Sequence, residues 1–494
     1  MPAQRYRFPM QTTDTLSRTE RLDGLRFGPA HKKLLVGSGI GWALDAMDVG
    51  LISFIMAALA KEWQLSQGQL STLASAGFVG MMIGASVGGL LADKIGRRNV
   101  FALTLLIYGV ATGASALAGG VGVLIALRFI VGLGLGAELP VASTLVAEYA
   151  PRHIRGRVVV ALESFWAAGW LAAALVGFLV VPLDGGWRWA LITGVIPALY
   201  AIVVRRHLPE SVRYLESRGR LTEAEAAVRS FEKGTTRYEA PTPPRTTMSP
   251  DATNAAAPHT SADAEVPAPS GLVGLLRTRS LRGRALALSA VWFFVNLAYY
   301  GTFIWLPTLL FLQGHSLVKS FAYTLIITLA QLPGYAAAAY LVEKIGRRAT
   351  LSSFLVGSAL AAAAFGLQTT PTGIMIAGCL VSFFNLGAWG ALYAIGPEVF
   401  PTAVRATGTG LAAATGRVAG IIAPLLVPPL LAFGDSLTGS LGPVALSGTI
   451  VVFAVFAVSF LAASAAVWAL PEKTNQDLEH SLPAPTRAPS TSAA

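Results

Sequence analysis

"ADKIGRR", residues 92–98, returns almost unchanged 250 residues later as "VEKIGRR", residues 342–348. The tripeptide "LPE" also occurs twice, at residues 208–210 and 470–472, each time after the last long apolar run of a half. Repeats in the same order indicate that the chain arose by duplication. We therefore expect two halves of the same architecture joined by a connecting segment.

Two charged residues repeat with the same spacing. Glu148 and Arg155 match Glu398 and Arg405, again at an offset of 250 residues. Six apolar spans in each half, repeated in parallel orientation, are the arrangement of major facilitator transporters. The predicted fold is thus an all-α membrane protein with twelve transmembrane helices, in two six-helix halves around a central cavity.

Composition supports a polytopic membrane protein. Charged residues make up only 13% of the 494 residues, whereas a soluble domain has about 25%. Apolar runs near 20 residues recur along the chain, and each is long enough to cross a bilayer core of about 30 Å. The expected spans are 34–60, 70–92, 99–118, 121–147, 158–182, 187–206, 284–312, 318–342, 349–368, 372–399, 404–432 and 444–470.

These spans divide the chain into two bundles and three polar parts. The linker contains "LTEAEAAVRSFEK" (221–233), a short amphipathic helix, and a Pro-, Thr- and Ala-rich stretch (234–270) with the composition of a disordered segment. The predicted parts are an N-terminal segment 1–33, a bundle 34–206, a linker 207–283, a bundle 284–470 and a tail 471–494.

The net charge of +11 is concentrated in short loops such as "APRHIRGR" (150–157). Basic short loops mark the cytoplasmic side, so we expect an inner (plasma) membrane protein with both termini in the cytoplasm and no nucleic-acid partner. The single Cys379 excludes a disulfide framework and a cysteine metal cluster, and we expect no secretory signal peptide in residues 1–33, which are polar and lack a short apolar segment.

The repeated loop resembles the signature loop of the major facilitator superfamily. The resemblance implies that its charged residues, and the acid and arginine that follow spans 4 and 10, gate the cytoplasmic side. The alternative is that the arginines only mark the cytoplasmic face. The candidate gating residues are Asp93, Arg97, Arg98, Glu148, Arg155, Glu343, Arg347, Arg348, Glu398 and Arg405.

Besides Glu398 at the end of span 10, four acids lie inside apolar spans, where a charge costs about 2.5–3.5 kcal/mol and must face a partner or the bundle interior. Asp45 and Asp48, in "GWALDAMDVGL" (41–51), are three residues apart and share a helix face. Acids this close repel each other, so one is expected to hold a proton near neutral pH. Asp45, Asp48, Glu138 and Glu163 are candidates for proton coupling; the alternative for each is an ion pair that only folds the bundle.

Aromatic and amide side chains recur at helical spacing in spans 5, 7 and 10. Flat aromatic walls with few amides favour a planar ring ligand over a sugar, although aromatic residues also fill ordinary cores and interfacial belts. The candidate substrate-binding residues are Asp45, Trp166, Trp170, Trp292, Asn296, Tyr299, Tyr300, Asn385, Trp389, Tyr393 and Arg417.

Apart from Arg405 at its start, Arg417 is the only charged residue of span 11, and because arginine keeps its proton it must be paired. Asp45 or Glu163 is one kind of partner. The other is the carboxylate of a substrate, held through two parallel hydrogen bonds. The surrounding "ATGRVAG" resembles the same span of mammalian organic anion transporters, where the arginine meets the anion.

Taken together, "DAMDVGLISFI", "GAELPVASTLV", "ESFWAAGWLAAAL" and "SFFNLGAWGALYA" resemble bacterial niacin transporters, a branch near the aromatic-acid/proton symporters and organic-ion carriers. The resemblance covers all twelve spans. It implies import of a small aromatic carboxylate, nicotinate first of all, by proton symport with alternating access.

The same resemblance implies a monomer in the lipid bilayer whose partners are a small aromatic anion and protons. No enzyme activity, cofactor or metal is expected. A benzoate-type acid, an organic ion or a sugar remains an alternative substrate. A membrane sensor that binds its ligand without cycling remains the alternative of another class.

Overall fold

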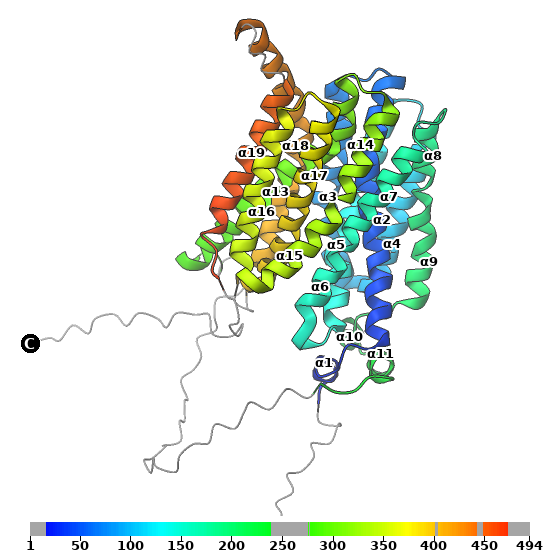
Figure 1. Cartoon of the computed structure of the whole chain (residues 1–494). Helices are drawn as coiled ribbons and strands as arrows, with labels where there is room; N and C mark the ends of the chain where they lie inside the picture. Colours follow the sequence, from blue (N-terminus) through cyan, green and yellow to red (C-terminus); the bar gives the residue numbers. More distant parts are fainter. Residues whose placement is uncertain (1–15, 239–274, 276, 401–403, 442–447, 473–494) are drawn as a thin grey trace, which may run out of the picture.

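The computed structural model describes residues 16–238, 275, 277–400, 404–441 and 448–472 (Figure 1). Within these residues the chain is helical, and its extended pairing is limited to an antiparallel bridge between Leu25 and Arg237. The stretch 234–270, expected to be disordered from its composition, lies outside the described residues except for 234–238.

The first half forms one bundle, in blue to green in Figure 1. Its helices are α2 (Pro29–Glu62), α3 (Gln67–Ile95), α4 (Arg97–Ser115), α5 (Val121–Tyr149), α6 (Arg155–Glu163), α7 (Phe165–Leu179), α8 (Gly186–Ile192) and α9 (Val195–His207). Three short helices lie below it: α1 (Arg18–Asp23), α10 (Val212–Ser217) and α11 (Leu221–Glu232), the last within the stretch expected to be an amphipathic helix.

The second half forms the neighbouring bundle, in green to red. Its helices are α13 (Arg279–Leu312), α14 (Leu317–Leu329), α15 (Gln331–Ile345), α16 (Arg347–Gly366), α17 (Pro371–Ile395), α18 (Arg405–Leu441) and α19 (Gly448–Val467).

Eleven segments of the described chain are long and apolar enough to cross a membrane. The remaining predicted span, which is the third along the chain, corresponds to helix α4. It packs against α5 and α9 within the bundle, but its 19 residues begin with Arg97, Arg98 and Asn99, which lower its mean hydropathy. The all-α membrane fold predicted from the sequence is therefore confirmed.

Three spans are interrupted near their middle, which the hydropathy pattern did not indicate. Span 5 consists of α6 and α7, span 6 of α8 and α9, and span 8 of α14 and α15. In the first two, a hydroxyl at the break donates to the carbonyl three residues earlier: Ser164 to Ala161 at 2.8 Å and Thr193 to Ala190 at 2.6 Å. Such bonds compete with the helix ladder and weaken it locally.

The two halves meet along equivalent helices. The first span of each half, α2 and α13, are in contact. The second span of each half contacts the fifth span of the other: α3 packs against α18, and α14 packs against α7. The α3–α18 contact corresponds to the α14–α7 contact when the two halves are exchanged. The interface therefore has the pseudo-twofold symmetry that the duplicated sequence predicts.

Glycines bring α3 and α5 to backbone contact. A methyl group built on Gly132 would lie 2.0 Å from the carbonyl oxygen of Gly77, and one on Gly136 would lie 2.1 Å from that of Met81. In lipid, helices associate by such close packing rather than by the hydrophobic effect. The glycine-rich stretch of α5 is therefore a packing surface, and α5 holds its charged residues against α2 and α4.

We predict that Gly132→Ala destabilises the protein, because α3 and α5 must separate to admit the methyl group. Overpacking of this kind costs about 1–3 kcal/mol. Thermal unfolding of purified protein in detergent should show a midpoint lowered by several degrees. Gly122→Ala is the matched control in α5, since nothing lies within 4 Å of its added methyl group. Equal midpoints for the two variants would contradict the packing role.

Candidate substrate and proton site

Aromatic side chains from both halves form a continuous cluster between α2, α7, α13 and α17. Ring centres lie 5.2 Å apart for Trp42 and Trp166, and 5.7 Å apart for Tyr299 and Trp389. The indole Nε1 of Trp166 donates to the Tyr299 hydroxyl at 3.2 Å, a hydrogen bond between the halves. This aromatic cluster contains Trp42, Trp166, Trp170, Trp292, Tyr299, Tyr300, Trp389 and Tyr393.

Arg417 of α18 lies at the edge of the aromatic cluster and is half-buried. Its guanidinium is beside the Tyr300 hydroxyl and 3.5 Å from the sulfur of Met81. Asp45 and Glu163 are within electrostatic range. Neither carboxylate forms an ion pair with Arg417 in the described part of the chain, so its strong donors face no acid at contact distance.

Asp48 forms a buried ion pair. Its carboxylate accepts a hydrogen bond from Arg128 of α5 at 2.7 Å and one from Thr112 of α4 at 2.6 Å. Both charged side chains are almost fully buried. Asp48, a candidate for proton coupling, thus forms an ion pair that joins α2, α4 and α5.

Asp45 lies on the same helix face as Asp48 but has different neighbours, namely Glu138 of α5 and Tyr108 of α4. The carboxylate oxygens of Asp45 and Glu138 are buried and accept no hydrogen bond from the described residues. Glu138 reaches close to α2 because residue 41 is glycine: a methyl group there would lie 3.0 Å from Oε1. The hydroxyl of Tyr108 is a donor beside this pair, and two adjacent buried carboxyl groups avoid like-charge repulsion by sharing a proton.

Glu163 is the last residue of α6. It is buried beside Trp42 and Tyr393, within electrostatic range of Arg417. It thus connects the aromatic cluster to the break between α6 and α7.

The two amides considered from the sequence differ in their bonding. The Nδ2 of Asn296 donates to the backbone oxygen of Trp292 at 2.6 Å, within its own helix. Asn385 is fully buried one turn from Trp389, and neither of its amide atoms has a hydrogen-bond partner among the described residues. Asn385 therefore has unused donor and acceptor capacity next to the aromatic cluster.

The candidate gating residues lie at one end of the bundle, which we call the basic end. In the first half, Gly96 turns the chain at a φ of 98°. Arg97 pairs with Asp93 at 2.9 Å and lies 3.8 Å from Glu148. The backbone N–H of Arg98 donates to Glu210 at 3.1 Å.

The second half repeats this arrangement. Gly346 turns the chain at a φ of 89°, and Arg347 pairs with Glu398 at 3.2 Å. The backbone N–H of Arg348 donates to Glu472 at 3.1 Å. Arg405 is near the carbonyl oxygen of Phe400, at 3.4 Å.

Two gating candidates have partners outside their own repeat. Arg155 forms an ion pair with Asp23 of α1. Glu343 lies 3.5 Å from Arg157, so this exposed pair connects the two halves at the basic end.

Sequence reasoning missed several residues that complete these sites. Tyr108 and Met81 are ordinary apolar-span residues in the sequence and give no signal. Glu210 and Glu472 belong to the repeated "LPE" tripeptide, which was recognised as a repeat but given no role. Each accepts a backbone N–H at the start of the helix after the glycine turn, where acceptors stabilise a helix N-terminus.

Two repeated six-helix halves that meet along equivalent spans are the architecture of major facilitator transporters. A charged and aromatic site between the halves is where such proteins bind solute. The sequence model of the family described as "Sugar (and other) transporter" matches residues 32–481, and the chain belongs to this family.

Similar proteins support this assignment. The chain is 44% identical over 459 residues to the niacin transporter NiaP of Acinetobacter baylyi, covering 92% of this chain and 97% of the relative. It is 41% identical over 447 residues to the putative niacin/nicotinamide transporter NiaP of Bacillus subtilis, covering 90% and 97%. The xylose transporter XylE of E. coli, in a partially occluded inward open conformation, has the same fold with a TM-score of 0.68 at 18% identity, covering 90% and 99%.

We predict that Asp48→Asn strongly destabilises the protein, because it leaves the Arg128 guanidinium buried without a counter-charge. Breaking a buried pair in this way costs about 3–5 kcal/mol. Thermal unfolding and the folded fraction on size-exclusion chromatography measure the effect. Asp93→Asn is the control, since it removes an exposed Asp–Arg pair worth about 0–1 kcal/mol. Similar losses in both variants would contradict a structural role for the buried pair.

Proposed function

We propose that the protein imports nicotinate, or a closely related small aromatic carboxylate, together with a proton. The two relatives named as niacin transporters share nearly their whole length with this chain. The observation that carries the proposal is Arg417, a half-buried guanidinium beside the aromatic cluster that has no acid of the described residues at contact distance. A permanent cation in a lipid-spanning helix needs an anion, and a substrate carboxylate would supply it.

The remaining site residues suit a pyridine ring. Trp166, Trp292 and Tyr393 are half-buried members of the aromatic cluster, so their rings are available to stack on a flat ligand. Asn385 offers an unpaired amide that would donate to the pyridine nitrogen. A benzoate-type acid would use the arginine and the rings but not this amide.

The proton would be carried by Asp45 and Glu138. These two carboxyl groups lie together in the interior beside the hydroxyl of Tyr108, whereas Asp48 is occupied by Arg128. One proton entering with one carboxylate anion makes the loaded step electrically neutral. This matters because moving one elementary charge against a membrane potential costs about 2.3 kcal/mol per 100 mV.

The proposed orientation places the basic end in the cytoplasm of an inner-membrane protein, with both termini on that side. It is supported by the arginines that cluster at this end in both halves, since positively charged short loops stay cytoplasmic.

We predict that Arg417→Ala abolishes nicotinate binding and uptake, while Arg417→Lys retains a part because it keeps the charge but loses the two-pronged geometry. Ligand-induced thermal stabilisation of purified protein measures binding of nicotinate, nicotinamide, benzoate and xylose. Wild type should be stabilised by nicotinate, and Arg417→Ala by none of the acids. The proposal is wrong if nicotinamide stabilises as well as nicotinate does, or if the alanine variant still responds to the acid.

Glu138→Gln should uncouple the proton from the substrate. The variant keeps a hydrogen-bonding side chain of the same shape but holds no exchangeable acid proton. In liposomes loaded with unlabelled nicotinate, we expect exchange with labelled nicotinate to continue. Accumulation driven by an inward proton gradient should fall at least tenfold.

Exchange in liposomes also tests the sensor alternative. A receptor that binds without cycling would show ligand-induced stabilisation but no exchange, even as wild type. If Glu138→Gln accumulates nicotinate at the wild-type level when a proton gradient is applied, Glu138 does not carry the coupled proton.

A further inference from the structure

Four basic side chains gather where span 1 begins and span 6 ends, at the basic end. The helices α2 and α9 lie side by side there (Figure 1). The Tyr200 hydroxyl donates to the carbonyl of Gly37 at 2.7 Å, and a methyl group built on Gly37 would lie 3.0 Å from Leu208. Within about one and a half helical turns of this contact, at exposed positions, lie the residues that we call the basic corner: Lys32, Lys33, Arg205 and Arg206.

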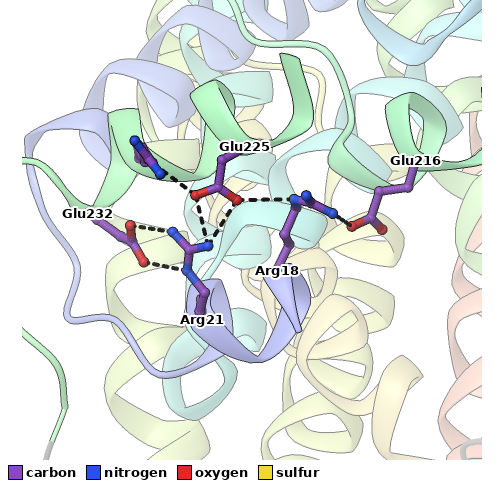
Figure 2. Close-up of polar contacts among 6 residues, drawn as sticks. Arg18, Arg21, Glu216, Glu225 and Glu232 are labelled. Atoms are coloured by element: carbon purple, nitrogen blue, oxygen red, sulfur yellow. Dashed lines mark hydrogen bonds and ion pairs between the residues drawn. The ribbon is translucent and has the colours of Figure 1, made fainter. Parts of the chain in front are cut away.

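The basic corner lacks acidic partners, unlike the arginines of α1. Figure 2 shows Arg18 and Arg21 bound to glutamates of α10 and α11 by ion pairs of 2.7 to 3.2 Å. The charges of these two arginines are therefore neutralised within the protein. By contrast, no acid of the described residues forms an ion pair with a residue of the basic corner. Its positive charges remain uncompensated over a small area of the surface, and they favour an anion as ligand.

Exposed apolar side chains continue from the basic corner along both spans. On α2, Val36 and Ile40 follow Lys33 by three and seven residues, so they share its helix face, and they are 39% and 40% exposed. On α9, Val203 precedes Arg206 by three residues and is 40% exposed. The surface is thus cationic at the ends of the two spans and apolar along them, which is the amphiphilic pattern of a phospholipid.

The second half lacks the α9 part of the basic corner. Counted back from the "LPE" tripeptides, Arg205 and Arg206 correspond to Val467 and Trp468. Orientation in the membrane depends on the number of basic residues in the short loops, and it does not require them to gather at one corner of one half. The position of these four charges therefore calls for a local explanation.

We propose that the basic corner binds an anionic phospholipid of the surrounding bilayer. The lipid phosphate lies between the lysines of α2 and the arginines of α9, and the acyl chains lie along the exposed apolar side chains of both helices. Arginine binds phosphate oxygens through its planar fork, and lysine adds a point charge. Basic pockets between spans on the cytoplasmic side bind anionic headgroups in this way. A soluble anion would use the charges but leave Val36, Ile40 and Val203 without a partner.

The test measures lipid preference at the corner itself. Val203→Cys, in a Cys379→Ser background, carries a bimane fluorophore, and the protein is placed in phosphatidylcholine nanodiscs with a small fraction of brominated lipid. Brominated chains quench bimane on contact. The quenching by brominated phosphatidylglycerol, divided by that by brominated phosphatidylcholine, is the local preference for the anionic lipid. We expect a ratio of at least about five, because one basic side chain near the headgroups accounts for about a fivefold preference.

A second label position separates this site from the bilayer at large. Ala465→Cys occupies the place of Val203 in the second half, counted from the "LPE" tripeptides, and it is also exposed. The same fluorophore there should show a clearly lower ratio, because the basic pair of α9 has no counterpart in that half.

Matched charge changes test the basic residues. Lys33→Gln with Arg206→Gln should lower the ratio at the first label to that at the second. Arg279→Gln with Arg282→Gln removes the same charge from exposed positions at the start of α13 and should leave the ratio unchanged. Lys33→Arg with Arg206→Lys keeps both charges and should keep the preference. Size-exclusion profiles confirm that each variant is folded before it is labelled.

The proposal is overturned if the two label positions give equal ratios, since the basic residues then act only as a marker of the cytoplasmic side. It is also overturned if the double glutamine variant of the corner keeps the preference, or if the α13 variant loses it to the same extent. The assay needs no solute, so its outcome is independent of whether nicotinate is the substrate.

Discussion

A charge inside a lipid-spanning helix must meet a counter-charge or a polar ligand, and this constraint organises the centre of the protein. Asp48 and Arg128 satisfy it through each other. Their ion pair, completed by Thr112, joins three helices of the first half. The backbone contact of α3 with α5 holds α5 at the depth where Arg128 and Glu138 reach α2.

Arg417, Asp45 and Glu138 satisfy the same constraint only in part. Each is held within the bundle, yet among the described residues the arginine has no acid at contact distance and neither acid forms an ion pair. The fold therefore leaves two positions incompletely paired. One is the cationic Arg417 on α18, and the other is the acidic pair formed by Asp45 of α2 and Glu138 of α5. A substrate anion and a proton are the two species that would complete them.

Much of the architecture followed from the sequence, because span length and repeat spacing are properties of the chain alone. The partners did not follow as easily. Asp45 and Asp48 share a face, and only the packing of α4 and α5 decides that Asp48 meets Arg128. The aromatic residues were placed on the correct faces by helical spacing, but which faces meet depends on how the halves dock. The partner of Arg155 could not be predicted, because Asp23 belongs to a segment whose polar composition gave no sign of folding.

The two glutamates of the "LPE" tripeptides have an evolutionary consequence. Glu210 caps α4 and Glu472 caps α16, so each half carries the acid that stabilises its own glycine turn. The capping acid and the turn must then have been present together in the ancestral six-helix chain. That ancestor already supplied the acid that stabilises its own glycine turn, so two copies could pair as separate polypeptides before a gene fusion joined them.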